Sequence, residues 1–131
     1  MTGVDTNVLV RYIMQDDARQ AAIATRFIES LADDSPGFLP LVVIIELGWV
    51  LSSAYELTRD QLVQALEGVL QTKEFRVEQS DVVSRALRRF KSGGADFADC
   101  LIEQSASAAG CERTVTFDKK AAKGCGMELL A

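Results

Sequence analysis

The sequence contains no histidine, and this absence excludes several kinds of catalytic site. A Ser-His-Asp triad, a Cys-His pair and acid–base catalysis by imidazole all need a histidine to move a proton. A zinc site with histidine ligands is excluded for the same reason. An enzyme built from this chain must therefore use carboxylates, hydroxyls, Lys or Arg, or hard metal ions bound by carboxylates.

Cysteines and long apolar runs are also scarce. Cys100, Cys111 and Cys125 are irregularly spaced and form no CxxC pair, which favours small, reduced, buried or half-buried residues in a cytosolic protein. The longest apolar run, FLPLVVIIELGWVL, is interrupted by Pro40 and Glu46 and is too short for a membrane span. Because no basic and apolar leader opens the chain, we expect a cytoplasmic protein with no membrane partner.

The charge balance is acidic, with 14 Lys and Arg against 19 Asp and Glu and a formal net charge of −5. Such a balance does not by itself indicate a nucleic-acid-binding protein. The apolar content of 48% and the charged content of 25% are those of an ordinary globular protein. At 131 residues the chain is long enough for one hydrophobic core, so we expect a single domain over residues 1–131.

Short apolar segments alternate with stretches of helical periodicity along the chain. Strands are expected at 2–6, 38–40, 75–77 and 113–118, and at the C-terminal end. Helices are expected at 7–13, 16–32, 41–57, 58–71, 80–92 and 95–110, with a short one after 118. This alternation is typical of a parallel sheet with helices on both faces. The sequence therefore predicts an α/β protein, a three-layer sandwich around a central, mainly parallel sheet.

Local signals set several of these boundaries. Thr58 and Gln61 form a T-x-x-Q capping box at the start of one helix. Pro40 is expected as the first residue of the helix that follows it. Ser80 is expected to cap a helix that stops at Gly93.

Two aspartates are expected at strand ends. TGVDT reads as a short buried strand with Asp5 near its carboxyl end, where open α/β sheets build their sites. Asp118 ends another predicted strand and shares a face with Thr116. A single Asp in this position is more often a helix cap than a ligand, whereas two of them together with a misplaced Glu shift the balance toward a site.

Glu46 lies within an apolar helix pattern. Its neighbours three and four residues away are Val42, Val43, Trp49 and Val50. A glutamate surrounded by apolar side chains is paired, neutralised or bound to a cation. Alternatively, it reaches past them to solvent or to an arginine, and the sequence leaves both readings open.

Asp96 and Asp99 begin the helix expected at 95–110. In one reading they form a capping box, with Asp96 as the N-cap and Asp99 three residues later. In the other reading Asp99 points over the sheet edge with the other acids, and Asp96 shares its helix face. The spacing alone does not decide between these readings.

A divalent cation would explain acids in these positions. If three or four carboxylates converge, their mutual repulsion costs on the order of several kcal/mol at an intermediate dielectric constant. A cation between them removes that cost, and ligands that are all oxygen suit Mg²⁺ or Mn²⁺. The pattern therefore predicts a site for one or two such ions.

The order of the motifs resembles the PIN domain family, and more narrowly the VapC-type toxin ribonucleases of prokaryotic toxin–antitoxin pairs. VDTNVLVRYI is similar to the family's opening strand, with Asp5 as the first acid, and VVIIELGWVL resembles the helix that carries the second, Glu46. DFADCLIEQSASAAGCERTVTFDKKAAK resembles the closing segment. Its third acid lies eleven residues before the helix-ending glycine, which selects Asp99 over Asp96, and the fourth is Asp118. One departure is PLVVII, where relatives often carry Ser or Thr a turn before the second acid.

The resemblance implies a PIN-like fold and a ribonuclease that hydrolyses RNA phosphodiester bonds with one or two Mg²⁺ or Mn²⁺ ions. The catalytic residues and metal ligands it implies are Asp5, Glu46, Asp99 and Asp118. Supporting residues would be Thr6, Asn7, Asp96 and Thr116. The family implies a cognate antitoxin as partner, and both the family and the apolar helix at 58–71 favour a homodimer.

Two basic stretches are candidates for phosphate contact. They are Arg85, Arg88, Arg89 and Lys91 on one helix, and Lys119, Lys120 and Lys123 after the last acid. Each is also explained as an ordinary solvated helix face. Lys119 and Lys120 are the stronger candidates for contact with RNA phosphate, because they directly follow Asp118.

Two other functions fit parts of the pattern. One is a non-catalytic PIN-like binding module, although all four acids are present. The other is a magnesium-dependent phosphotransfer or receiver-like domain. A haloacid-dehalogenase-type phosphatase would need a second Asp where Asn7 stands, and a receiver would need the acidic pair Asp16–Asp17 directly after the first strand.

Overall fold

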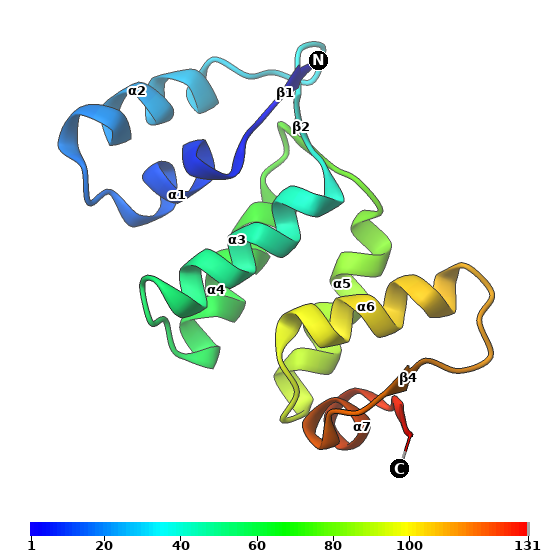
Figure 1. Cartoon of the computed structure of the whole chain (residues 1–131). Coiled ribbons are helices and arrows are strands. Elements are labelled where there is room, and N and C mark those ends of the chain that lie inside the picture. Colours follow the sequence, from blue (N-terminus) through cyan, green and yellow to red (C-terminus); the bar gives the residue numbers. More distant parts are fainter. Residues whose placement is uncertain (131) are drawn as a thin grey trace. The chain divides into compact units, whose positions relative to one another are not determined.

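The computed structural model describes residues 1–130, and the chain forms two compact units (Figure 1). Unit 1 is Met1–Glu78 and unit 2 is Gln79–Ala131. Each unit has its own helices, short strands and buried apolar side chains. The α/β class and the parallel strand pairing expected from the sequence are confirmed in both units. A single domain over residues 1–131 stays a prediction.

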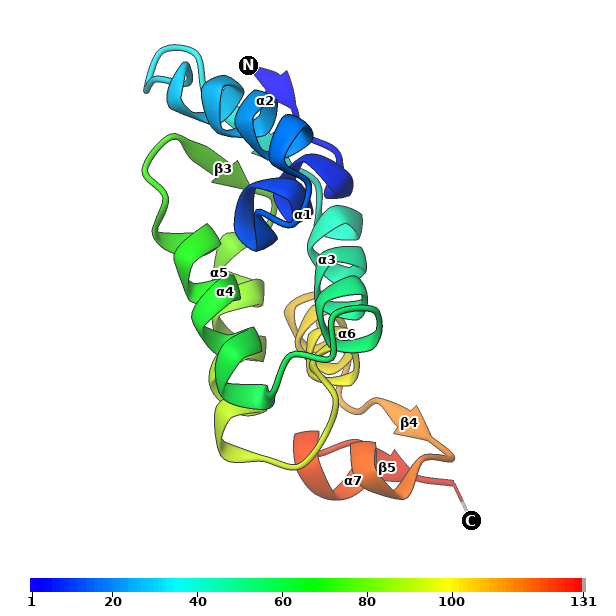
Figure 2. The ribbon, with the colours of Figure 1, turned by 90° about the vertical axis from the view of Figure 1, so that its left-hand side faces the viewer.

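Unit 1 contains three strands and four helices. In chain order these are β1 (Thr2–Gly3), α1 (Thr6–Met14), α2 (Ala18–Glu29), β2 (Gly37–Leu39), α3 (Leu41–Ser53), α4 (Arg59–Gln71) and β3 (Phe75–Val77). The strands form one sheet in the order β1-β2-β3, and both pairs are parallel. Helix α1 packs against α2 and against α3 (Figures 1 and 2).

Leucine dominates the core of unit 1. The large side chains that are fully buried in this unit are Leu9, Leu39, Ile44, Leu47, Leu51 and Leu66. Burying one such side chain stabilises the fold by about 1.5–3 kcal/mol. Because these residues come from α1, β2, α3 and α4, the core holds α1 beside α3. The first two candidate acids lie directly before α1 and on α3.

Unit 2 is built on a helix pair. Its elements are α5 (Ser80–Ser92), α6 (Phe97–Ala108), β4 (Val115–Thr116), α7 (Lys119–Cys125) and β5 (Glu128–Leu129), and β4 pairs with β5 in parallel. Phe90 on α5 meets Phe97 on α6 edge to face, with ring centroids 6.0 Å apart. A Cβ on Gly93 would lie 2.4 Å from the carbonyl oxygen of Gly124, so glycine is needed where α5 ends against α7.

Several local predictions are confirmed. The capping box of α4 is formed, because the Gln61 N–H donates to Thr58 Oγ1 at 3.2 Å and the Thr58 N–H donates to Gln61 Oε1 at 2.9 Å. β3 spans 75–77, and α5 ends with Gly93 as its C-cap. Helices α2 and α6 lie inside their predicted ranges.

Three helix boundaries differ from the prediction. Ser80 is the first helical residue of α5 and not its cap, because the Gln79 carbonyl accepts the first helical hydrogen bond, from Val83. Pro40 is the N-cap of α3 and not its first residue. α3 ends at Ser53, short of the predicted 57, and the left-handed conformation of Glu56 (φ 53°) cannot continue a helix.

The strands are shorter and more exposed than predicted. β1 contains only Thr2 and Gly3, both exposed, so TGVDT is not a buried strand, although Val4 is buried. β4 ends at Thr116, and Phe117 is 82% exposed. Two-residue strands are too short to show the alternation by which buried and exposed faces are recognised.

The cysteines follow the prediction in two of three cases. All three are free thiols, and Cys100 and Cys125 are buried, but Cys111 is exposed. Cys111 lies in the loop directly after Gly110, beyond the end of α6.

The apolar face of α4 is used within the chain. Its residues Leu62, Val63, Leu66 and Val69 are buried in the single chain. The face that favoured a homodimer is therefore already covered. Within residues 1–130, no helix combines the length and the apolar character needed to cross a membrane.

Candidate active site

Asp5 is exposed and caps α1. Its Oδ1 accepts a hydrogen bond from the Thr6 N–H at 2.7 Å, which satisfies one of the helix's unpaired amide groups. Asp5 is thus not buried, although TGVDT was expected to be a buried strand. Because the cap uses Oδ1, the Oδ2 atom of Asp5 is left for another interaction.

Thr6 connects the first two candidate acids. Its side chain is buried, and its hydroxyl donates to Oε1 of Glu46 on α3, forty positions along the chain. The backbone of Thr6 thus binds Asp5 while its side chain binds Glu46. In unit 1, one buried threonine orients both carboxylates.

Glu46 lies on an exposed side of α3. Val42 and Trp49, two of the apolar neighbours expected to surround it, are each 68% exposed. The expectation that apolar side chains bury Glu46 is therefore wrong, whereas its binding to a cation stays a prediction. The alternative reading applies, in which the carboxylate reaches solvent, with the Thr6 hydroxyl as its partner.

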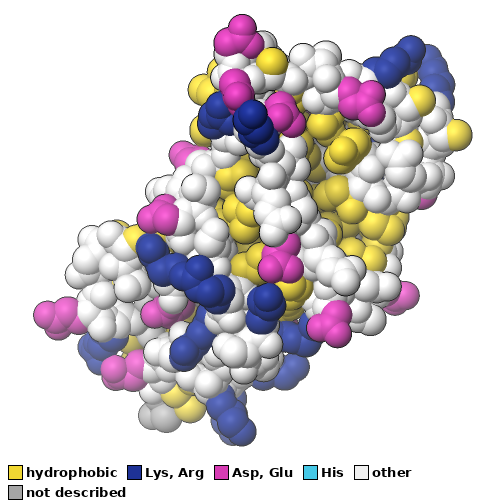
Figure 3. Space-filling model, turned by 180° about the vertical axis from the view of Figure 1, so that it is seen from behind, with side chains coloured by type: hydrophobic (Ala, Val, Ile, Leu, Met, Phe, Trp, Pro, Cys, Tyr) yellow, Lys and Arg dark blue, Asp and Glu magenta, His cyan; other side chains and the backbone are white. Residues whose placement is uncertain are grey.

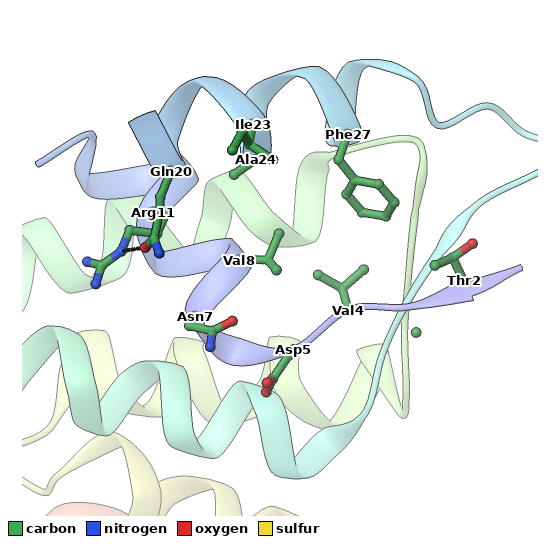
Figure 4. Close-up of a pocket in the computed structure, with 11 residues that line it drawn as sticks. Thr2, Val4, Asp5, Asn7, Val8, Arg11, Gln20, Ile23, Ala24 and Phe27 are labelled. Carbon is green, nitrogen blue, oxygen red and sulfur yellow. Dashed lines mark hydrogen bonds between the residues drawn. The ribbon is translucent and has the colours of Figure 1, made fainter. Parts of the chain in front are cut away.

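A pocket of about 590 Å³ adjoins Asp5 in unit 1 (Figure 4). Its apolar lining comes from Val4, Val8, Ile23, Ala24 and Phe27. The Asp5 carboxylate points away from Val8 and Phe27, and Asn7, one of the predicted supporting residues, lies beside it (Figure 4). The part of the pocket that adjoins Asp5 is therefore lined by apolar side chains, and the Asp5 carboxylate does not point toward them.

Asp118 is the N-cap residue of α7, and its side chain accepts hydrogen bonds from the first turn of that helix. Its Oδ1 accepts from the Lys120 N–H at 2.8 Å and from the Ala121 N–H at 3.4 Å. The Asp118 N–H in turn donates to Thr116 Oγ1 at 3.0 Å. Thr116, predicted as a supporting residue, thus orients the backbone of this acid.

Asp99 is half-buried near two other carboxylates of unit 2. Burial, and after it the negative charges of Asp96 and Asp118, raise the pKa of Asp99. Asp96 is the N-cap residue of α6, but its side chain makes no capping hydrogen bond. The capping box proposed for Asp96 and Asp99 is therefore not formed, and the three acids are electrostatic neighbours.

One further acid near this group was not predicted. Burial, followed by the charges of Asp99 and Glu103, raises the pKa of the buried Cys125 thiol. Glu103 lies one helical turn after Asp99, and this i,i+4 spacing was the signal that could have identified it.

The candidate acids thus form two sets, one in each unit. Asp5 and Glu46 share Thr6 in unit 1, and Asp99 lies close to Asp96 and Asp118 in unit 2. In the part of the chain that the structure describes, no group of three or more Asp, Glu or Cys side chains is arranged to hold a metal ion. A joint action of all four acids stays a prediction.

Helices joined by short parallel strands, with carboxylates at the strand ends, define an α/β protein with an acidic site. The chain belongs to the PIN domain family, because the sequence model of the PIN domain matches residues 4–126. The chain is also similar to a VapC ribonuclease of Aquifex aeolicus (strain VF5). The two are 27% identical over 120 residues, which cover 92% of this chain and 89% of the relative.

Proposed function

We propose that this protein is a ribonuclease that hydrolyses RNA phosphodiester bonds with Mg²⁺ or Mn²⁺. The observation that carries the proposal is the grouping of Asp96, Asp99 and Asp118 in a chain of the PIN domain family. The name of the Aquifex aeolicus relative supports RNA as the substrate. The absence of histidine is consistent with chemistry that needs no imidazole.

Three carboxylates of unit 2 are of the chemical type that binds a hard divalent cation, although their side chains are not arranged around one in the described residues. Asp96, Asp99 and Asp118 provide only oxygen donors, and their negative charges lie close enough to disfavour one another. The Oδ2 atom of Asp118 is not used by its helix cap. When bound, such a cation lowers the pKa of water and offsets the charge that develops on phosphate.

The proposed roles follow the family motif and the local contacts. Asp5, Glu46, Asp99 and Asp118 are the proposed metal ligands and catalytic residues. Thr6 orients Glu46 through its hydroxyl, and Thr116 holds the backbone of Asp118. Asn7 and Asp96 support the ligands from beside them, and Lys119 and Lys120 are proposed to contact RNA phosphate.

A toxin role is the finer part of the proposal. It rests on the resemblance to VapC-type toxins, which also implies a cytoplasmic protein, a homodimer and a cognate antitoxin. Expression of the chain in bacteria should stop growth, and Asp99→Asn should restore it. Normal growth with the wild-type chain present would contradict the toxin role and leave the nuclease activity open to assay.

Cleavage of RNA tests the activity itself. Purified protein should cut RNA when Mg²⁺ or Mn²⁺ is added, and EDTA should stop the reaction. Asp60→Asn is a matched control for Asp99→Asn, because Asp60 is exposed in the first turn of α4 and is no candidate ligand. Equal cleavage in excess EDTA would overturn the proposal, and RNA binding without cleavage would favour a non-catalytic binding module.

A further inference from the structure

Some Lys and Arg side chains of the chain form ion pairs, and others do not. In unit 1, Arg11 pairs with Asp16 at 3.4 Å, and Lys73 pairs with Asp33 at 3.4 Å. In unit 2, Arg113 pairs with Glu128 at 2.6 Å. Within residues 1–130, five exposed cations of unit 2 form no ion pair, and they are Arg88, Arg89, Lys119, Lys120 and Lys123.

These five cations come from two helices that pack together. α5 contacts α7, and a Cβ on Gly126 would lie 3.1 Å from Nη2 of Arg89, so the Arg89 side chain extends to the C-terminal end of α7. The three lysines lie on the outer side of α7, because Ala121 and Cys125 are buried on its inner side. We call the five residues the basic surface. On the face shown in Figure 3, Lys and Arg side chains are numerous in the lower half, with Asp and Glu side chains between them.

An aromatic side chain stands beside the basic surface. Phe117 is 82% exposed, the most exposed large apolar residue in the part of the chain that the structure describes. It lies between Thr116 and Asp118 and precedes Lys119 and Lys120 directly. Proteins that bind single-stranded nucleic acid combine cations that follow the backbone with exposed rings on which bases stack.

We propose that the basic surface and Phe117 form the RNA-binding face of this protein. The cations contact successive phosphates of a single strand, and the Phe117 ring stacks on a base next to Asp118. This inference rests on the proposed function and adds to it a means of holding the substrate. RNA is favoured over an acidic protein because the surface offers one stacking ring among cations, and protein interfaces have apolar cores with few charges.

Salt dependence of binding measures the phosphate contacts. Binding of a short fluorescein-labelled oligouridylate is followed by anisotropy in EDTA, at several salt concentrations. For single strands, each phosphate contact contributes about 0.7 to the slope of log K against log salt. The triple variant Arg88→Gln, Arg89→Gln, Lys123→Gln should bind more weakly. Its slope should be less steep, with a magnitude smaller by about 2.

A matched control uses exposed cations of α2. Arg19 and Arg26 form no ion pair in residues 1–130, and changing both to Gln should leave the slope unchanged. Phe117→Leu should weaken binding about tenfold with the slope unchanged, and Phe117→Tyr should restore it. A triple variant that keeps the wild-type slope would overturn the proposed surface.

The assay separates this inference from the proposed activity. If the wild type cleaves RNA but the variants bind like it, the surface is wrong and the ribonuclease stands. If the slope falls as expected but no RNA is cleaved, the surface is supported and the ribonuclease is wrong. Displacement of the oligouridylate by polyglutamate as readily as by unlabelled RNA would indicate an acidic protein ligand and overturn RNA binding here.

Discussion

The two units of the chain differ in charge. Unit 1 contains six Lys and Arg against twelve Asp and Glu, a formal charge of −6. Unit 2 contains eight Lys and Arg against seven Asp and Glu, a formal charge of +1. The net charge of −5 is thus the sum of an acidic unit and a nearly neutral one. A composition summed over the whole chain conceals a surface that suits a polyanion.

The units also differ in how they hold their candidate acids. In unit 1 each acid has a donor, since the N–H of Thr6 binds Asp5 and its hydroxyl binds Glu46. In unit 2 Asp99 is half-buried beside two other negative charges. Unit 1 therefore satisfies its carboxylates without a cation, whereas unit 2 would gain more from binding one.

The largest effect is expected on activity when an acid of unit 2 is neutralised. Asp99→Asn should abolish cleavage, while Asp96→Asn should lose only part of it, as measured with labelled RNA. Asp96→Asn should leave the free energy of unfolding nearly unchanged, because its side chain caps nothing. A greater loss of activity from Asp96→Asn would show that the third ligand is Asp96.

A glycine in each unit gives opposite effects on stability. A Cβ on Gly124 would lie 2.4 Å from the Ala95 nitrogen, so Gly124→Ala should destabilise unit 2 by about 1–3 kcal/mol. Gly68 lies in α4 with nothing within 4 Å of a Cβ, and Gly68→Ala should stabilise the fold by about 0.5–1 kcal/mol. Urea unfolding measures both, and Gly94→Ala, also without a close neighbour, is the control for unit 2.

A smaller effect on activity and stability is expected from loss of the hydrogen bond between Thr6 and Glu46. Thr6→Val keeps the shape and removes the donor, so we expect a loss of about 1 kcal/mol in the free energy of unfolding and a partial loss of cleavage. Glu46→Gln should reduce cleavage sharply and leave metal-free stability nearly unchanged, because the side chain is exposed. Added Mn²⁺ should raise the melting temperature of the wild type more than that of Glu46→Gln. Equal metal stabilisation of both proteins would remove Glu46 from the ligand set.

The smallest effect is expected at a polar cluster of unit 1. The Tyr55 hydroxyl donates to Asp16 Oδ2 at 2.7 Å, and this hydrogen bond is the main cause that lowers the pKa of Asp16. Because the folded pKa is lowered, the contribution to stability is present above the ordinary pKa of 3.8 and is lost as the pH falls through the lowered value. Tyr55→Phe should raise the pKa of Asp16, measured by NMR of its carboxyl carbon.

The same hydrogen bond acts on Tyr55 at high pH. Asp16 raises the pKa of Tyr55 above its ordinary value of 10.0. Its contribution to stability is present below pH 10.0 and is lost as the pH rises through the raised value. Asp16→Asn should lower the pKa of Tyr55, followed by ultraviolet absorbance. Unchanged titration in both variants would mean that the cluster is not formed in solution.

Helices and β3 were predictable from the sequence to a useful degree, whereas the length and exposure of β1 and β4 were not. The capping box of Thr58 and Gln61 is a local arrangement, so the residues that form it are sufficient to identify it. β1 and β4 contain two residues each, and their pairing depends on partners distant in the chain. The sequence left the exposure of Glu46 open, and the side chain is exposed because its helix neighbours Val42 and Trp49 are apolar but uncovered.

The sequence by itself determined the family and the order of the acids. Without histidine, and with Asp5, Glu46, Asp99 and Asp118 in that order, it indicated carboxylate chemistry and the PIN family. These features depend only on residue type and spacing, which are the same in the unfolded and the folded chain.

Only the tertiary structure decided which groups meet. Thr6 binds Glu46 across forty positions because the core packs α1 against α3, and Asp99 lies near Asp118 because α6 packs against α7. The same packing leaves Phe117 exposed. Contacts of this kind depend on which apolar helix faces pack against each other. The periodicity of one helix does not specify which other helix it packs against.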